Sequence, residues 1–305
     1  MAGDVRARAL GLGYTAGWGL LKTLPAGVSD RAFRAVADAA TVRNGPAARQ
    51  LRANLRRVVG PGTSELRMDR LVGEGLRSYA RYWRETFLLE SMDHAEVVDS
   101  FDRHFVGMEH YRAALAGGRG TILALTHSGN WEASGIWLAA DSGSFATVAE
   151  RLKPESLFDR FVEYRQSLGM EVLPLTGGDR PVATVLAERL RENKVVCLLA
   201  DRDLSRNGIE VDFFGEPTRM PAGPALLAAT TGASLHAVHS YFVGDEWGHT
   251  VSPPIVLPEG RLRERVRAGT QAMADLFAGY IAGKPEDWHM VQKLWLADLD
   301  PRPES

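Results

Sequence analysis

The chain has 305 residues, of which 45% are hydrophobic and 24% are charged. These are ordinary values for a globular protein with a sizeable core, and they exclude a disordered chain and a coiled-coil rod. The single cysteine, Cys197, excludes a disulfide scaffold and a structural zinc cluster, and it indicates a reducing compartment.

The net charge of −2 is unevenly distributed along the chain. Residues 1–60 hold ten basic and three acidic side chains, a net +7, which leaves −9 for the remaining residues. A basic arm on an acidic body predicts a polyanionic partner, either nucleic acid or an anionic membrane face.

A run of 13 mostly apolar residues lies between Arg8 and Lys22. A membrane-spanning helix needs about 20 apolar residues, so this run is too short to cross a bilayer. Asp4 in the preceding segment and the lack of a clean cleavage site argue against a signal peptide. With Tyr14 and Trp18 between flanking cations, the run predicts a helix that lies in the membrane interface. The alternative is a terminal helix packed on its own domain.

The first 100 residues read as helices. One is expected to begin at Ser29 or Asp30, a second to cover 46–59 and stop at Gly60, and a third to cover 64–90. The third has the strongest apolar repeat every three or four residues. Its aromatic stripe fits a buried core better than a ligand site: Tyr79, Trp83 and Phe87.

After residue 100 the pattern changes to short apolar runs that alternate with helical segments. Strands are expected at 121–126, 144–149, 170–175, 194–200, 210–214, 234–243 and 249–256, and helices at 131–140, 154–168, 181–193, 222–231 and 260–282. Such alternation predicts an α/β fold with a mainly parallel central sheet flanked by helices. Ligands bind beyond the carboxyl ends of the strands in such sheets, so the residues there are the candidates for chemistry.

His127 is the strongest candidate for a catalytic residue, because it directly follows a predicted buried strand. Asn130 is a good helix cap, which puts Glu132 in the first turn of the next helix. A carboxylate on one imidazole nitrogen would fix the tautomer and leave the other nitrogen as a general base. The spacing therefore predicts a His127–Glu132 pair. The alternative is a purely structural cap with a satisfied histidine.

Further candidates follow the later strands. Asp201 and Arg202 come after the strand at 194–200, where Arg202 could hold a phosphate and Asp201 could accept from sugar hydroxyls. Glu150 follows the strand at 144–149, and Arg165 lies on the helix after it. The chain also has a polar turn at 285–289, with an interfacial-type Trp288 next to His289.

The order of these blocks resembles the bacterial lipid A biosynthesis lauroyl/myristoyl acyltransferase family. The blocks are His-x4-Glu at 127–132, Glu-Arg at 150–151, Asp-Arg-Asp at 201–203, Phe-Phe-Gly at 213–215, Gly-Pro at 223–224, Thr-Gly-Ala at 231–233 and Pro-x-x-Trp-His at 285–289. The family usually has Asp-Gln-Asp where this chain has Asp-Arg-Asp. The composition, rich in Ala, Arg and Gly, is typical of a high-GC actinobacterium, which would lack lipid A. The resemblance therefore points to the family's mycobacterial branch, which acylates phosphatidylinositol mannosides.

The resemblance implies a glycerolipid-acyltransferase-like fold in one domain over 1–305, with a helical membrane-facing part at 1–100 and a catalytic core at 101–305. It implies acyl-CoA as co-substrate, a mannose hydroxyl of phosphatidylinositol mannoside as acceptor, and no metal or other cofactor. His127 would be the base and Glu132 its partner. Substrate contacts would come from Asn130, Glu150, Arg165, Asp201, Arg202 and His289.

We therefore expect a peripheral enzyme on the cytoplasmic face of the plasma membrane, bound to anionic lipids. No covalent intermediate is expected, because no credible nucleophile is present. A carrier-protein donor, another glycolipid acceptor, and a non-catalytic protein that binds anionic lipid are the alternatives. Nucleic acid is not expected as a partner, because the body is acidic and no recognition motif occurs.

Overall fold

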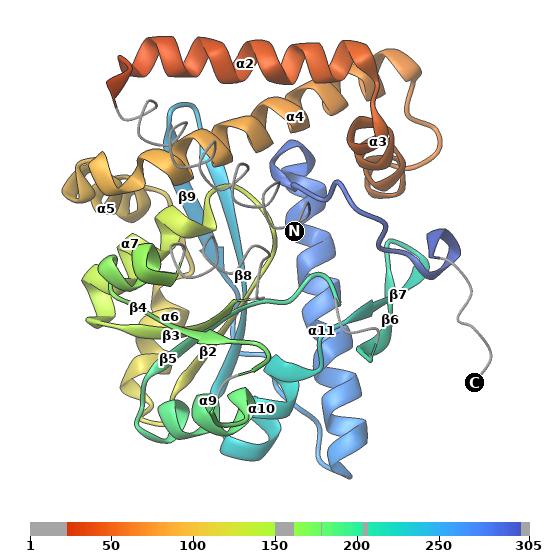
Figure 1. The fold of residues 1–305 in the computed structure, drawn as a ribbon. Helices are drawn as coiled ribbons and strands as arrows, with labels where there is room; N and C mark the ends of the chain where they lie inside the picture. The colour runs from red at the N-terminus through yellow and green to blue at the C-terminus, as the bar shows by residue number, and fades with distance from the viewer. Residues whose placement is uncertain (1–22, 150–161, 178, 204–206, 300–305) are drawn as a thin grey trace, which may run out of the picture.

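The computed structural model describes residues 23–149, 162–177, 179–203 and 207–299 (Figure 1). A seven-stranded sheet lies at its centre, in the order β1-β9-β8-β2-β5-β3-β4. Every neighbouring pair is parallel except β8 and β9. The strands are β1 (Phe105–Val106), β2 (Thr121–Leu125), β3 (Phe145–Ala149), β4 (Met170–Pro174), β5 (Val195–Leu199), β8 (Ser234–Val243) and β9 (Glu246–Val251). The predicted α/β class with a mainly parallel sheet is confirmed.

Helices cover both faces of the sheet, as the alternation within β2 shows. Ile122 and Ala124 are buried in one core cluster, and Leu123 and Leu125 in another. The first cluster holds residues of α9 (Val182–Arg191), α10 (Gly223–Thr231) and α11 (Leu262–Gly283). The second holds residues of α5 (His94–Arg103), α6 (Met108–Ala116) and α7 (Trp131–Ser142). Strands covered on both faces are apolar at most positions, which is why they read as nearly continuous apolar runs.

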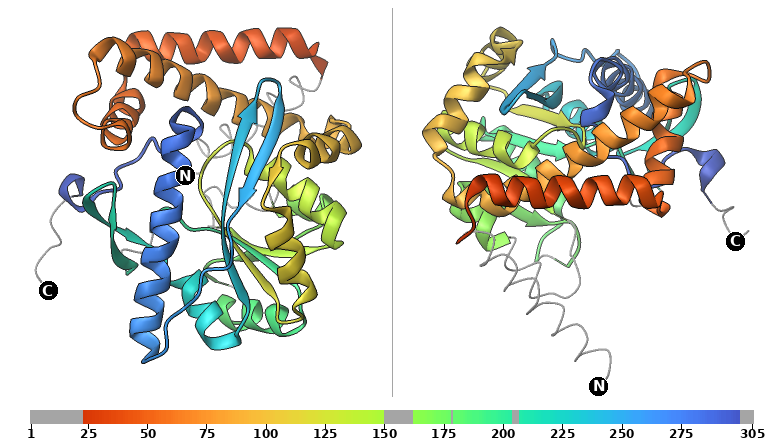
Figure 2. Two further views of the ribbon diagram at one scale, coloured as in Figure 1. Left: turned by 180° about the vertical axis from the view of Figure 1, so that it is seen from behind. Right: turned by 90° about the horizontal axis from the view of Figure 1, so that it is seen from above.

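A helical layer closes one end of the molecule. It consists of α2 (Ala26–Arg43), α3 (Pro46–Val59) and α4 (Glu65–Leu88), followed by the short helix η1 (Leu89–Ser91). In the views of Figures 1 and 2, α2 lies across α4 on the outside of this layer. The three helices share a separate apolar cluster that includes Ala37, Leu51, Leu55, Met68 and Leu76.

The remaining elements are a two-stranded hairpin and two short helices. The hairpin pairs β6 (Ile209–Phe213) with β7 (Glu216–Met220), and the short helices are η2 (Pro285–Asp287) and η3 (Leu296–Asp298). The sequence patterns missed α5, α6, β1 and β7. They also placed the start of β9 at residue 249, three residues too late, and its end at residue 256. The strand ends at Val251, shortly before two prolines, which have no backbone N–H to donate to a neighbouring strand.

Of two expectations about the N-terminal region, one is corrected by the structure and the other concerns residues that it does not describe. Helix α2 begins at Ala26, before the expected Ser29 or Asp30, and Ser29 is buried within it. The apolar run between Arg8 and Lys22 lies outside the described residues. Within the part of the chain that the structure describes, no helix is long and apolar enough to cross a bilayer.

Candidate active site

The register of two neighbouring strands brings His127 and Asp201 together. β2 and β5 are parallel, and Leu125 pairs with Leu199 at their carboxyl ends. Two residues beyond this pair, the chain places His127 on one strand end and Asp201 on the other. The site therefore forms where parallel sheets present their ligand-binding edge.

His127 and Asp201 form a tightly coupled dyad. His127 Nδ1 lies 2.5 Å from Asp201 Oδ1, and the His127 backbone amide donates to Asp201 Oδ2 at 2.9 Å. Burial alone raises the pKa of the Asp201 carboxyl, but the charge and hydrogen bonds of His127 and the indole of Trp288 outweigh it, so this pKa lies below its ordinary value. An ionised carboxylate only accepts hydrogen bonds, so Nδ1 carries the proton and Nε2 is left as a base.

The expected pairing of His127 with Glu132 is therefore wrong. Both carboxylate oxygens of Glu132 accept from Arg165, at 3.1 Å from Nε and more closely from Nη2. The Glu132 side chain is almost fully buried, and the bidentate ion pair compensates its charge. Burial lowers the pKa of the Arg165 guanidinium, but the attraction of Glu132 reverses this and raises it. Glu132 thus anchors the start of α7 to the helical residues 162–167.

The expected role of Asp201 as a sugar contact is also corrected, because its side chain is fully buried against His127 and Trp288. Asn130 is likewise fully buried. It caps α7 by accepting from Ala133 at 3.0 Å, and its amide donates to Glu85 at 2.8 Å. Asn130 is a helix cap, not a substrate contact.

The segment after α11 reaches the site and borders His127. The His289 backbone amide donates to the His127 carbonyl at 2.9 Å, and the His289 side chain hydrogen-bonds Ser78 of α4 at 3.0 Å. Burial, with the nearby positive charge of His127, lowers the pKa of His289 to about 3. Trp288, expected at an interface, is instead fully buried.

Arg202 is another of the predicted contacts at this edge. It follows Asp201, is half-buried, and its Nη1 donates to Gln292. Its Nε is buried and has no hydrogen-bond partner among the described residues. Arg202 therefore retains donors for a ligand. Glu150 lies outside the described residues. Within the described ranges, no group of three or more His, Cys, Asp or Glu side chains could hold a metal ion.

A narrow apolar pocket runs between α7 and the sheet. It encloses about 740 Å³, its open mouth included. Every strand of the central sheet contributes to its lining, for example Phe105, Leu125, Phe145, Met170, Leu198, Val238 and Val251.

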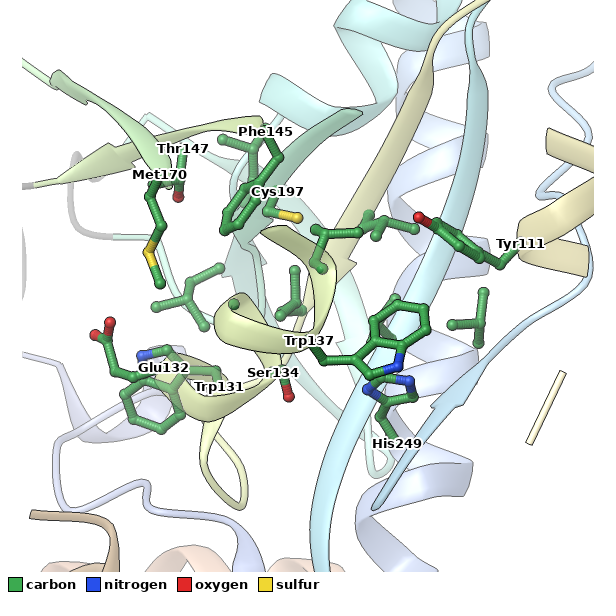
Figure 3. A pocket seen from close by; sticks show the side chains of 18 of the residues that line it. Tyr111, Trp131, Glu132, Ser134, Trp137, Phe145, Thr147, Met170, Cys197 and His249 are labelled. Atoms are coloured by element: carbon green, nitrogen blue, oxygen red, sulfur yellow. The ribbon is translucent and has the colours of Figure 1, made fainter. Parts of the chain in front are cut away.

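The pocket begins beside the dyad. Trp131 lines it and lies 5.5 Å from the His127 ring, centroid to centroid. Figure 3 shows Trp131 and Glu132 at one side of the pocket and Tyr111 at the opposite side. An apolar chain that entered this pocket would therefore have one end near His127.

The aromatic stripe of α4 divides between core and site. Phe87 is buried in the core, whereas Tyr79 is half-buried with its ring 5.2 Å from that of His289. Tyr82, which the sequence analysis did not select, stacks on Trp131 at 4.0 Å. Burial and the nearby Glu132 charge raise the pKa of Tyr82. Helix α4 therefore supplies one wall of the site.

Comparisons with known proteins show the family of this chain. Residues 5–297 match the family model described as bacterial lipid A biosynthesis acyltransferase. The phosphatidylinositol mannoside acyltransferase of Mycolicibacterium smegmatis (strain ATCC 700084 / mc(2)155) is 54% identical over 288 residues, covering 94% of this chain and 92% of the relative. The protein of the same name from Mycobacterium tuberculosis (strain CDC 1551 / Oshkosh) is 53% identical over 286 residues, covering 94% and 88%.

Proposed function

Because the chain belongs to the family of bacterial lipid A biosynthesis acyltransferases, it is an acyltransferase, and we propose that it moves a fatty acyl group from acyl-CoA to a mannose hydroxyl of a phosphatidylinositol mannoside. The acceptor is inferred from the names of the relatives. The donor is what the resemblance to the family implies, and the apolar pocket beside His127 supports an acyl chain as the group transferred. The observation that carries the proposal is the His127–Asp201 dyad next to that pocket.

The proposed chemistry is direct transfer. His127 Nε2 takes the proton of the acceptor hydroxyl, and the oxygen attacks the thioester carbonyl carbon. Asp201 stabilises the imidazolium formed in this step. The tetrahedral intermediate then collapses, the carbon–sulfur bond breaks, and the coenzyme A thiolate leaves and takes the proton from the imidazolium. The scheme requires no covalent enzyme intermediate, metal or further cofactor.

The oxyanion of the intermediate needs hydrogen-bond donors. The amide of Gly129 donates to the Asp287 carbonyl at 2.9 Å, so it is not free for this purpose. Trp131 occupies the first helical position of α7, where a backbone N–H has no acceptor within the helix. We assign the Trp131 amide to the oxyanion and the free donors of Arg202 to the phosphate or sugar hydroxyls of the acceptor.

Membrane binding is the second part of the proposal, because both reactants are amphiphiles. The outward face of α2 exposes three valines, Val28 at 47%, Val36 at 68% and Val42 at 86%, with Arg31 and Arg43 exposed beside them. An apolar stripe flanked by cations suits the surface of an anionic bilayer. We propose that α2 binds the cytoplasmic face of the plasma membrane.

Helix α4 connects this surface to the site. It packs against α2, and its residues Ser78, Tyr79 and Tyr82 contact His289. A bilayer in contact with the exposed face of α2 would therefore lie at the same end of the molecule as the site. The cations Arg52, Arg56 and Arg57, which also belong to the basic arm, are ion-paired with carboxylates of the protein and so contribute less.

The proposal is tested by following thiol release from palmitoyl-CoA, with and without phosphatidylinositol mannoside. We expect release that depends on the acceptor and is lost in His127→Ala. The protein's own thiol is a small background, because Cys197 is buried and its burial raises its pKa. Release from palmitoyl carrier protein alone would overturn the donor, and transfer only to another glycolipid would overturn the acceptor.

A further inference from the structure

Trp288 is the residue that follows η2, and its side chain contacts Asp201 of the dyad. Its side chain is fully buried, and its indole Nε1 donates to Asp201 Oδ2 at 2.9 Å. The same oxygen accepts from the His127 backbone amide. The Asp201 carboxylate therefore binds three N–H groups, two from His127 and one from Trp288.

The indole is held rigidly in this position. Its ring packs edge-on against Phe213 at 6.1 Å and against Trp295 at 6.2 Å. The backbone around it is fixed as well, since Trp288 and Ser128 form an antiparallel bridge. A single segment thus fixes both the loop that carries His127 and the carboxylate that faces it.

We propose that Trp288 is a positioning residue for acyl transfer, which acts through Asp201 by holding Oδ1 toward His127 Nδ1. The inference rests on the proposed function, because it concerns the dyad assigned to proton transfer. A carboxylate bound from two fixed directions cannot rotate away from the imidazole, and supporting contacts of this kind determine how accurately a catalytic group is held. The hydrogen bond from the indole N–H also stabilises the negative charge of the carboxylate and so weakens its attraction for the imidazolium.

Trp295 provides a matched control on the same chain. It is also fully buried, but its indole donates to the backbone carbonyl of Phe213 at 2.9 Å and not to the dyad. Trp288→Phe and Trp295→Phe each remove one buried indole N–H bond and a similar volume. A purely structural role for Trp288 predicts the same consequences for both variants.

The experiment compares the two variants in transfer from palmitoyl-CoA to phosphatidylinositol mannoside. For Trp288→Phe we expect kcat to fall about tenfold with KM nearly unchanged, since a hydrogen bond to a charged group is typically worth about a factor of ten or more. Without the indole, the carboxylate attracts the imidazolium more strongly, so the acidic limb of the pH–rate profile moves to higher pH. Trp295→Phe should leave both kcat and the position of the acidic limb of the pH–rate profile unchanged.

Equal loss of kcat in the two variants, or an unshifted limb in Trp288→Phe, would overturn the positioning role. If Trp288→Phe does not fold, benzothienylalanine at position 288 keeps both fused rings but lacks the N–H, and the same results are expected. The low-field proton resonance of the His127 Nδ1–H should move in the Trp288 variant only. This resonance does not depend on the substrate, so an inactive wild type would overturn the proposed function without deciding the inference.

Discussion

At the scale of single residues, the central feature is which carboxylate accompanies His127, the proposed base. His127 follows β2 and Asp201 follows β5, and the pairing of Leu125 with Leu199 brings their side chains within 2.5 Å. A carboxylate next to an imidazole favours the protonated form that arises during base catalysis. Asp201, not Glu132, is therefore the carboxylate that would support the proposed proton transfer.

We expect Asp201→Asn to lower kcat by about 10²–10⁴-fold, the range typical of general-base catalysis, because an amide cannot stabilise the imidazolium. Glu132→Gln should reduce kcat much less, since it weakens the ion pair with Arg165, whereas the His127 imidazole is bonded to Asp201. The kcat values of both variants in acyl transfer check this. If Glu132→Gln lost more kcat than Asp201→Asn, the data would favour Glu132 as the partner of His127, as expected from the sequence.

The sequence singled out His127 as the candidate base but paired it with the wrong carboxylate. His127 stood out because a polar residue followed a buried strand, a signal that lies within one segment. The partner depends on which strand lies next to β2, and sequence spacing carries no information on strand order. Glu132 was close along the chain, but the first turn of α7 directs its carboxylate toward Arg165. Asp201 was selected for its position after a strand, with the wrong function.

At the scale of elements, α7 forms the roof of the apolar pocket, and Gly135 leaves room beneath it. A Cβ added at Gly135 would lie 2.4 Å from Met170 Cε and 3.3 Å from Phe145 Cζ. Both neighbours line the pocket, so a larger side chain would narrow it. The absence of a side chain at position 135 is thus a means of keeping the pocket open.

For Gly135→Ala we expect a higher KM for palmitoyl-CoA and a relative preference for shorter acyl chains. Stability should be retained, because alanine is about 1 kcal/mol better than glycine in a helix. Kinetics with acyl-CoAs of increasing length measure the effect. Gly279→Ala in α11 is the control, since nothing lies within 4 Å of its added Cβ. Unchanged chain preference in Gly135→Ala would mean that the acyl chain does not use this pocket.

Helix α2 carries the prediction for membrane binding. Val36→Asp together with Val42→Asp should weaken binding to vesicles containing phosphatidylinositol, because charges replace the apolar stripe and add repulsion. The control is Val256→Asp, at a valine that is 84% exposed in the loop before α11. Figure 1 shows the start of α11 at the opposite end of the molecule from α2. Sedimentation with vesicles measures binding. Equal effects of the α2 pair and the control would exclude α2 as the contact.

The elements that sequence patterns found were the long or strongly apolar ones. The repeat in 64–90 predicted α4, and the buried runs predicted β2, β5 and β8. β1 has only two residues and shows no alternation, and α5 and α6 are short helices whose apolar residues became clear only when packed under the sheet. Such elements are stabilised by tertiary contacts more than by local preference.

At the scale of the whole molecule, buried histidines make stability depend on pH. His239 and His249 are almost fully buried, and burial lowers their pKa values to about 4 and about 3. His249 lies among the rings of Phe101, Phe105 and Trp137, at centroid distances of 4.1–4.8 Å. The unfolded chain takes up these protons near pH 6.5, whereas the folded chain does not.

Stability is therefore lost as the pH falls below about 6.5, by up to about 1.4 kcal/mol per pH unit for each such histidine. We expect His249→Phe to reduce this dependence, because the variant has one fewer group that binds a proton only on unfolding. Urea unfolding at pH 5.5 and 7.5 measures the difference. Identical pH dependence in wild type and His249→Phe would contradict this account.

The fold as a whole joins two surfaces that the proposed reaction needs. The sheet supplies the dyad and the pocket, and the helical layer of α2–α4 supplies the apolar face and one wall of the site. The sequence predicted this division into a helical part and an α/β core from the change of periodicity near residue 100. The contact of α4 with the segment after α11 joins positions about 200 residues apart, which no local pattern reveals.

The most direct test of the account is to identify the product by mass spectrometry after mixing the protein, palmitoyl-CoA and phosphatidylinositol mannoside. We predict one added palmitoyl ester on a mannose, formed by wild type, and at least a hundredfold less formed by His127→Ala with its fold intact. An unmodified acceptor with wild-type protein, or the same product at the same rate with His127→Ala, would contradict the central claim.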